Sequence, residues 1–372
     1  MILMHRRIYT LLLCLALSMP TVAYGASLNV VFLNPGHPTG DKSGAFWSNV
    51  DKFMRAAASD LDIELTILHA ERNHLAMKRL ADEVHKYAPD YAIVVNEKGV
   101  GTDLLARIAQ RNIPVFFLLN TLNQTDIAAL KRHEKALIAG SLIPNNHSAG
   151  KALMGALVRT HRKKTGHVGN LNTIALLGDY TSPAALERQQ GMLSYMSENS
   201  NLALIDATVA NWSEREGYNK TRGLLKRERI DLIWSANDAI ATGASRAVKS
   251  SGSKHKITIG GFNWDKRSEK YPIDISFGGH VTLGAKALVM LKDLHQGLLT
   301  QCERHIVMDV FKPLSTDELD AFHKNTTPNN LDTFNFERFS KTSTAYSEFD
   351  IDVFVTRHYP TAQEQPPRLS CE

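Results

Sequence analysis

The sequence alternates regularly between short apolar runs and longer amphipathic segments. Continuous apolar runs are typical of strands buried on both faces of a parallel sheet. The segments between them carry the apolar period of helices that cover such a sheet on one side. The runs form two series, 28–34, 63–70, 91–96 and 115–120, and then 172–178, 202–210, 230–236 and 256–262. Two series predict an α/β chain with two doubly wound parallel-sheet lobes.

The division of the chain between the lobes follows from a helix that has no strand of its own. Residues 281–299 have a helical period, but no strand follows them in the second series, so we expect them to return to the first lobe. We therefore predict a first lobe of residues 27–140 plus 279–306 and a second lobe of residues 141–278, joined by a hinge of several strands. Residues 307–372 are polar with interspersed aromatics, and we expect an ordered extension packed on the lobes.

The first 25 residues have the three parts of a secretory signal peptide. Arg6 and Arg7 form a basic start, residues 9–19 form an apolar core too short to span a bilayer, and small residues at 23 and 25 suit signal peptidase. We predict cleavage after Gly25 and a location in the periplasm. Removing these residues takes away two arginines and changes the net charge from +5 to +3. A nearly neutral chain argues against a dedicated nucleic-acid binder.

Two cysteines, Cys302 and Cys371, remain after the predicted leader. Cysteine pairs in an oxidising compartment are often bridged. We predict a disulfide between these two residues, which would tie the end of the chain to the end of a helix. The alternative is two unpaired thiols.

Aromatic and amide residues follow one predicted strand after another. In an open parallel sheet, ligands bind at the carboxyl ends of the strands, so these residues are expected to line a cleft between the lobes. Aromatic rings stack on the C–H faces of a sugar, and amides exchange hydrogen bonds with its hydroxyls. The pattern therefore predicts a polyol or sugar as the ligand. The candidate residues are Phe46, Trp47, Asn96, Asn120, Tyr180, Trp212, Asn237, Asn263 and Trp264.

Some of these residues have a second, structural interpretation. Asp238 is expected to cap the helix that follows it and to leave Asn237 facing the cleft, although Asn237 and Asp238 together could be a plain helix cap. Tyr180, Trp212 and Trp264 could instead support the surface around the cleft. Phe46 and Trp47 could belong to the core.

Motifs of enzymes and metal sites are missing from the sequence. There is no nucleophile elbow, no P-loop and no dinucleotide-binding glycine pattern after the first strand. No group of His, Cys, Asp and Glu has the spacing of a zinc site. We therefore expect no catalytic residues, no metal and no cofactor. An exported carbohydrate-active enzyme would need an acid pair, for which Glu97 and Asp179 are the candidates.

Over nearly all of residues 28–300, the order and spacing of several short segments resemble the type I periplasmic sugar-binding proteins of the ribose and galactose group. Paired aromatics open the first helix, a Pro turn precedes the fourth strand, and an Asn-Asp pair ends a strand of the second series. The matching segments are "GAFWSNVDKFM" (44–54), "RNIPVFFLLN" (111–120), "SPAALERQQGM" (182–192), "IWSANDAIATGASRAVKSSG" (233–252) and "IGGFNWD" (259–265). The opening "VVFLNPGHPTGDKSGAFW" (30–47) also resembles the autoinducer-2 receptor branch.

The resemblance implies a monomer whose two lobes close on a small carbohydrate-like ligand. The closed form would then be presented to an ABC-type permease, or alternatively to a membrane sensor kinase. The chain departs from the ribose binders in its charged groups. Leu119 and Asn120 replace an aspartate-arginine pair, and Asn263 replaces an aspartate. The family's arginine falls on Leu186, so nearby Arg188 is the candidate for its role. These departures imply a ligand other than a pentose.

Overall fold

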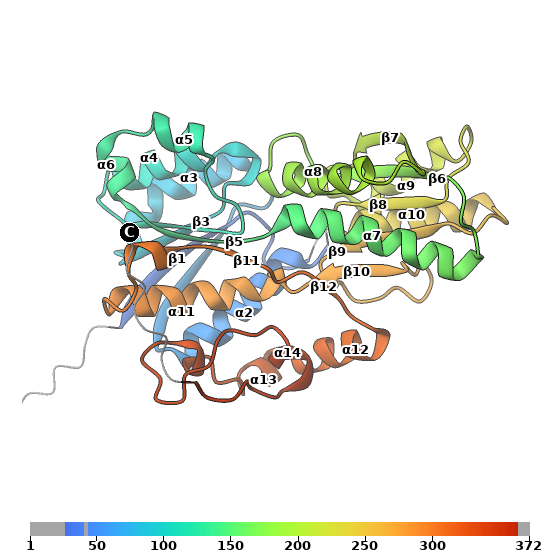
Figure 1. Ribbon diagram of the computed structural model, residues 1–372. Coiled ribbons are helices and arrows are strands. Elements are labelled where there is room, and N and C mark those ends of the chain that lie inside the picture. Colours follow the sequence, from blue (N-terminus) through green and yellow to red (C-terminus); the bar gives the residue numbers. More distant parts are fainter. Residues whose placement is uncertain (1–26, 41–43, 364–372) are drawn as a thin grey trace, which may run out of the picture.

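The computed structural model describes residues 27–40 and 44–363, and two six-stranded sheets organise them (Figure 1). The first sheet has the order β11-β5-β4-β3-β1-β2, and all of its pairings are parallel. Its strands are β1 (Leu28–Asn34), β2 (Ile63–His69), β3 (Tyr91–Val94), β4 (Val115–Leu118), β5 (Ile138–Pro144) and β11 (His305–Met308). The predicted α/β class with two parallel-sheet lobes is confirmed.

The second sheet has the order β12-β10-β9-β8-β6-β7 and is parallel except at its edge, where β12 runs antiparallel to β10. Its strands are β6 (Leu171–Leu177), β7 (Leu202–Val209), β8 (Leu232–Ser235), β9 (Thr258–Phe262), β10 (Ile275–Gly278) and β12 (Lys312–Pro313). The strand order is the same in both lobes when each is counted from its own first strand. In each sheet the strand order therefore reverses next to the first strand. Open α/β sheets form ligand sites at this point, outside the carboxyl ends of the strands.

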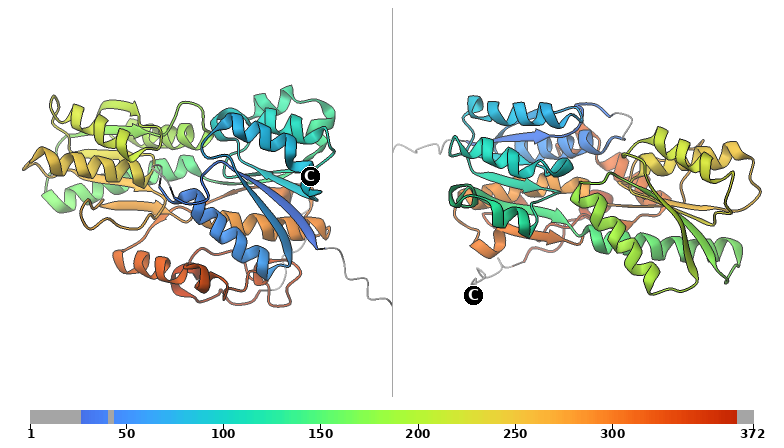
Figure 2. Two further views of the ribbon diagram at one scale, coloured as in Figure 1. Left: turned by 180° about the vertical axis from the view of Figure 1, so that it is seen from behind. Right: turned by 90° about the horizontal axis from the view of Figure 1, so that it is seen from above.

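Helices cover both faces of each sheet, which explains why most strands are apolar along their whole length. In the first lobe, α2 and α11 pack together on one face, and α3 and α4 on the other (Figures 1 and 2). In the second lobe, α7 pairs with α8 and α9 pairs with α10. The helices of the lobes are α2 (Phe46–Asp60), α3 (His74–Glu83), α4 (Gly101–Ala109), α5 (Gln124–Ala129), α6 (Arg132–Ala136), α7 (Asn146–Thr165), α8 (Pro183–Ser197), α9 (Glu214–Leu224), α10 (Asp238–Ser251) and α11 (Leu283–His295).

The chain crosses between the two sheets three times, and after β12 the C-terminal segment returns to the first lobe. It leaves the first sheet after β5, returns after β10, and leaves again between β11 and β12. All of β5 belongs to the first sheet, so the first crossing lies at residue 145 rather than at the expected boundary after residue 140. The segment after residue 307 adds β12 to the second sheet and then packs against the first lobe.

The remainder of the C-terminal segment packs against the first lobe beside α2 and α11 (Figures 1 and 2). It contains α12 (Thr316–Asn325), α13 (Pro328–Leu331) and α14 (Val353–Thr356). Phe53 of α2 is fully buried between Phe322 and Phe354, at ring distances of 6.2 and 5.0 Å. The aromatics that seemed scattered in the sequence thus extend the core of the first lobe.

Two sequence predictions lie outside the described residues. The predicted signal peptide, residues 1–25, is one, and the disulfide is the other because its partner Cys371 lies beyond residue 363. Within the described ranges, no helix combines the length and the apolar character that a membrane span requires. The same ranges contain no group of three or more His, Cys, Asp or Glu side chains arranged to hold a metal ion.

Candidate functional site

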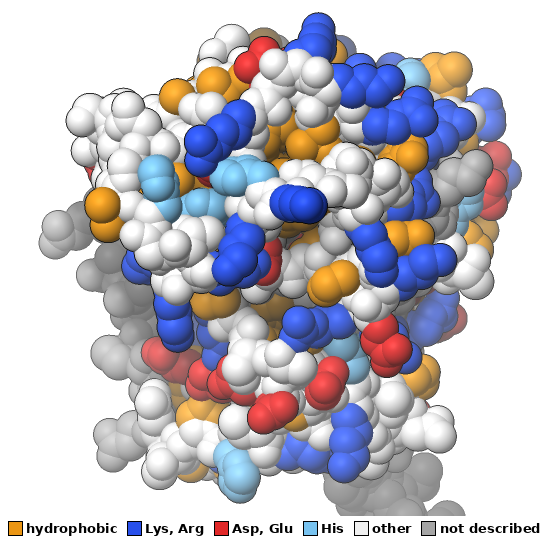
Figure 3. Space-filling view, turned by 90° about the vertical axis from the view of Figure 1, so that its right-hand side faces the viewer, with side chains coloured by type: hydrophobic (Ala, Val, Ile, Leu, Met, Phe, Trp, Pro, Cys, Tyr) orange, Lys and Arg blue, Asp and Glu red, His pale blue; other side chains and the backbone are white. Residues whose placement is uncertain are grey.

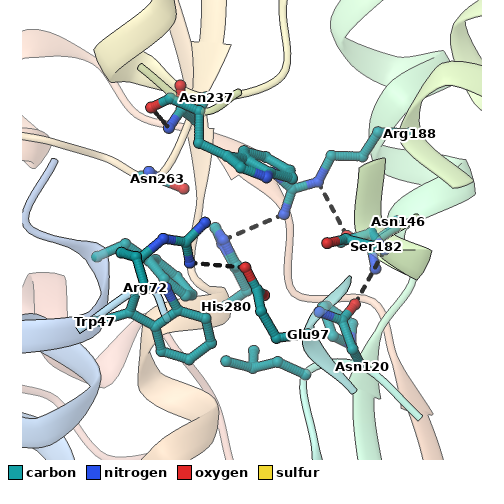
Figure 4. Close-up of a pocket in the computed structure, with 15 residues that line it drawn as sticks. Trp47, Arg72, Glu97, Asn120, Asn146, Ser182, Arg188, Asn237, Asn263 and His280 are labelled. Atoms are coloured by element: carbon teal, nitrogen blue, oxygen red, sulfur yellow. Dashed lines mark hydrogen bonds and ion pairs between the residues drawn. The ribbon is translucent and has the colours of Figure 1, made fainter. Parts of the chain in front are cut away.

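A cleft between the carboxyl ends of the two sheets is the candidate site (Figure 4). The space between its walls is about 580 Å³, and part of it is open to solvent. Both lobes and the hinge supply its walls. Seven of the residues predicted from the sequence line it: Phe46, Trp47, Asn120, Arg188, Trp212, Asn237 and Asn263.

Trp47 is held at the cleft by a glycine and by a buried polar cluster behind it. A Cβ at Gly36 would lie 2.2 Å from the Cβ of Trp47, so only glycine lets the indole pack this close to the turn after β1. The Asn34 amide donates to the Trp47 carbonyl and to the Asp51 carboxylate, at 3.3 and 2.7 Å. Asp51 also contacts His69 at 3.1 Å. This cluster fixes the first turn of α2, so the paired aromatics line the ligand site while they pack against the edge of the first-lobe core.

Trp212 is held on the opposite lobe by a similar arrangement. Gly178 lies under its ring, where a Cβ would come within 2.3 Å of the indole. The Asp179 carboxylate accepts from the indole nitrogen at 2.8 Å and from the Ser182 hydroxyl and backbone N–H at 2.6 Å each. Burial acts to raise the pKa of Asp179, but these hydrogen bonds outweigh it and hold that pKa below its ordinary value. Asp179 is therefore an ionised anchor for Trp212 and Ser182.

Arg188 lies in the middle of the cleft wall and is only 3 % exposed. Its guanidinium donates to the Asn146 side chain at 3.0 Å, to the Ala236 carbonyl at 2.9 Å and to Nε2 of His280 at 3.3 Å (Figure 4). Its carbon atom lies 4.6 Å from the ring centre of Phe262. Burial lowers the pKa of Arg188 to about 9, so the side chain remains a cation at neutral pH.

His280 is neutral and forms the hinge side of the cleft. Burial and then the charge of Arg188 lower the pKa of His280 well below its ordinary value. Because Arg188 can only donate, Nε2 of His280 is the acceptor and Nδ1 carries the proton. The ring stacks on Phe46 at 4.7 Å and lies 4.5 Å from Phe311. The His280 ring of the hinge thus contacts Phe46 of α2 and Phe311, the residue before β12.

The two lobes also touch directly at the mouth of the cleft. The side chain of Asn120, which follows β4, accepts from the backbone N–H of Ala184 in the second lobe at 3.0 Å. The backbone N–H of Lys98 donates to the Ser182 hydroxyl at 3.4 Å. Arg72 and Glu97 form an ion pair of 2.8 Å in the first-lobe wall. The described arrangement is therefore a closed one.

Three predicted residues do not line the cleft. Asn96 is buried, but its side chain donates to the Thr121 carbonyl and accepts from the Gly101 N–H, so it joins two first-lobe loops. Tyr180 is 76 % exposed and lies outside the cavity. Trp264 is 1 % exposed and lies in the core, where it donates to the Lys312 carbonyl at 2.9 Å.

Backbone conformation explains why Trp264 leaves the cleft while Asn263 stays in it. The two residues have φ values of 129° and 57°, which few non-glycine residues adopt. This turn leaves Asn263 in the cleft wall and turns Trp264 toward Phe322 of the C-terminal segment, at 5.1 Å. A spacing rule based on the strand alone could not have separated these neighbours.

The prediction that Asp238 caps the helix is wrong. Asn237 is itself the cap of α10, because its side-chain oxygen accepts from the Ile240 N–H at 2.9 Å. Its amide nitrogen donates to the Trp212 carbonyl at 3.2 Å. Asp238 is buried away from the cleft, where its carboxylate accepts from the Ser276 hydroxyl. Asn237 thus lines the cleft and positions Trp212 at the same time.

Comparison with known proteins assigns this architecture. A model described as "Periplasmic binding protein domain" matches residues 38–273, which is more than half of the chain. The chain belongs to the periplasmic binding protein family. The resemblance to the type I periplasmic sugar-binding proteins that was predicted from the sequence is thereby confirmed.

Several relatives of this periplasmic binding protein carry import functions in their names. A D-apiose import binding protein of Actinobacillus succinogenes is 23% identical over 301 residues, covering 79% of this chain and 87% of its own. The fructose import binding protein FruE of Bifidobacterium longum is 25% identical over 223 residues, covering 58% of this chain and 64% of its own. A solved periplasmic sugar-binding protein from Pseudomonas fluorescens is 27% identical with a TM-score of 0.74, covering 86% of this chain and 96% of its own.

The sequence did not single out several residues that line the cleft of this binding protein. Pro144, Asn146, Ser182 and Ala184 lie at the starts of crossovers or helices, where a cap or turn was the simpler interpretation. Arg72 lies after β2, where no aromatic or amide pattern drew attention. Glu97 and Leu119 were noticed for other reasons, namely as an acid and as a departure from the family, and His280 was not singled out as a cleft residue.

Proposed function

We propose that this protein binds a small sugar or sugar-like polyol in the cleft and delivers it to an ABC-type importer. The observation that carries the proposal is the composition of the cleft. Trp47 and Phe46 from one lobe and Trp212 from the other offer rings for the C–H faces of a sugar. Amides and hydroxyls between them, from Asn120, Asn263 and Ser182, suit its hydroxyl groups.

Closure of the lobes on the ligand is the proposed mechanism. The cleft is lined from both lobes and the hinge, so a ligand that contacts all of them stabilises the closed form over an open one. The three crossings at residues 145, 279 and 309–311 are short, which suits a hinge in which a few residues absorb the movement. The closed form then differs in outer surface from the open one, and a membrane partner can distinguish them.

The import role is supported by the relatives whose names include it, a D-apiose and a fructose import binding protein. A sensory role is the second candidate. One observation favours it: a structural neighbour with a TM-score of 0.67 is described as the fructose-binding periplasmic domain of a hybrid two-component system. At 18% identity that neighbour shares the fold, and the import relatives carry more weight.

The site residues assigned here are Phe46, Trp47, Asn120, Arg188, Trp212, Asn237 and Asn263, together with Ser182 and His280. The family is one of solute-binding proteins rather than enzymes. A periplasmic location accords with the family, and the cleaved leader of residues 1–25 and the monomeric state remain predictions. The disulfide between Cys302 and Cys371 is likewise a prediction.

A thermal-shift screen of the purified protein tests the proposal. The panel contains monosaccharides, alditols, sugar acids and autoinducer-2-like furanosyl compounds. A ligand at a hundred times its dissociation constant adds about 2.7 kcal/mol to the free energy of unfolding, which raises the Tm by several degrees. A hit among the carbohydrates supports the proposal, and a flat response to the whole panel contradicts it.

A further inference from the structure

We propose that the ligand of the cleft is an acidic sugar, an aldonic or uronic acid, whose carboxylate is bound by Arg188. The inference rests on the proposed function, since it specifies the class of sugar that enters the same site. It arises from the charges that face the cavity.

Among the described residues of the cleft wall, one positive charge is not balanced by a negative charge. In the part of the chain that the structure describes, four titratable side chains line the cavity, Arg72, Glu97, Arg188 and His280. Arg72 and Glu97 neutralise each other in an ion pair of 2.8 Å. His280 is neutral because burial and then Arg188 hold its pKa well below the ordinary value. Within this described part of the wall, the charge of Arg188 therefore has no opposite charge.

Two acids outside the cavity wall act on Arg188 without accepting a hydrogen bond from it. These acids are Glu187 and Asp238. Burial raises the pKa of Glu187. Burial, and then the neighbouring Asp265, raise the pKa of Asp238 well above the ordinary value. A buried cation without a close carboxylate carries a large desolvation cost, which an anionic ligand would offset.

The guanidinium also has hydrogen-bonding capacity left for a ligand. An arginine has five N–H donors, and within residues 27–40 and 44–363 three of those of Arg188 go to neutral acceptors, on Asn146, Ala236 and His280. The remaining donors are one on each terminal nitrogen. These two N–H groups remain for a ligand, and hydrogen bonds from a guanidinium to a carboxylate are stronger than those to a neutral acceptor. Phe262 packs against the guanidinium at 4.6 Å and holds it in place.

The second lobe as a whole favours an anion. Residues 145–278 contain 19 Lys and Arg against 12 Asp and Glu, a net charge of +7. Lys and Arg side chains gather over much of the end of this lobe in the space-filling view (Figure 3). Such a field raises the rate at which an anionic ligand arrives, and added salt weakens the effect.

Calorimetric titration of the wild-type protein against matched pairs is the test. Each pair joins an acid to its neutral counterpart, such as gluconate with glucitol and galacturonate with galactose. We expect the tightest ligand to be an acid that binds at least tenfold more tightly than its neutral counterpart, since hydrogen bonds between charged groups are about twice as strong as neutral ones. The preference should persist at 0.5 M NaCl, because the pair is buried.

Arg188→Gln supplies the residue-level readout, and Lys163→Gln is its control. Lys163 is an exposed cation of the same lobe at the far end of α7, so its replacement removes the same charge outside the cleft. Arg188→Gln should abolish the acid preference while Lys163→Gln retains it. If Arg188→Gln does not fold, the wild-type pairs alone decide.

The outcomes separate this inference from the proposed function. If the tightest ligand is a neutral sugar and its acid binds more weakly, the acidic-sugar inference is wrong and the sugar-binding function stands. An acid preference that survives in Arg188→Gln contradicts the assignment to Arg188. If no compound of the panel binds, both the inference and the proposed function are contradicted.

Discussion

The substitution Gly178→Ala tests how Trp212 is placed without touching a group that could contact the ligand. The new Cβ would lie 2.3, 2.6 and 2.6 Å from three atoms of the indole. Carbon atoms in contact lie about 3.5–4.0 Å apart, so the ring must move by more than about 1 Å. That movement also strains the 2.8 Å hydrogen bond from the indole nitrogen to Asp179.

The magnitude follows from those two contacts. Loss of aromatic stacking costs about 0.5–1.5 kcal/mol beyond buried area, and overpacking costs about 1–3 kcal/mol of stability. We expect the lost stacking to raise the dissociation constant of the bound sugar roughly two- to twelvefold, and the overpacking to lower the Tm. Gly223→Ala is the matched control, because it lies in α9 of the same lobe with no atom within 4 Å of the new Cβ.

Calorimetry and intrinsic tryptophan fluorescence measure both effects. Gly223→Ala should leave affinity unchanged and should slightly stabilise the helix, by about 1 kcal/mol at most. If Gly178→Ala binds as tightly as the wild type, with an unchanged fluorescence response to ligand, Trp212 does not form part of the site and the reasoning fails.

Three further predictions concern the same framework. Trp47→Ala should abolish ligand binding and keep a cooperative unfolding transition. Trp264→Ala should instead lower the free energy of unfolding by about 3–5 kcal/mol, because its side chain is buried in the core. Equal effects of the two substitutions on the Tm would contradict these placements. Asp179→Asn should cost roughly 2–4 kcal/mol in chemical denaturation at pH 7, from two lost charge-assisted hydrogen bonds. The pKa of Asp179 in the folded protein lies below its ordinary value of 3.8. The stability difference between the wild type and Asp179→Asn should therefore hold above about pH 5 and shrink as the pH falls through that pKa. A stability difference that grows in acid would contradict this prediction. Thiol counting before reduction should find Cys302 and Cys371 unreactive if they are bridged, and two reactive thiols would remove the disulfide.

The fold could be predicted from the sequence because the parallel strands are apolar along most of their length and most of them are followed by an amphipathic helix. That pattern has few solutions other than two doubly wound lobes. Two of the four edge strands, β11 and β12, were missed because they are short. β11 has four residues that alternate between exposed and half-buried, and β12 has only two.

The site could be predicted only where a strand end fixes the direction of the residue. Trp47 and Trp212 were found because each follows a strand at the carboxyl edge. Trp264 satisfies the same rule, but its side chain packs against Phe322 of the C-terminal segment, a contact between residues far apart in the sequence. Asn146 and His280 were missed because they enter the cleft from the hinge crossings, and local sequence does not reveal which lobe a crossing will face.

A crystal structure of the protein with the tightest ligand from the screen tests the central claim most directly. The account predicts electron density for one ligand between the lobes, in contact with Trp47 of the first lobe, Trp212 of the second and the guanidinium of Arg188. Density that contacts a single lobe, or that lies in a cavity away from these three side chains, would contradict it.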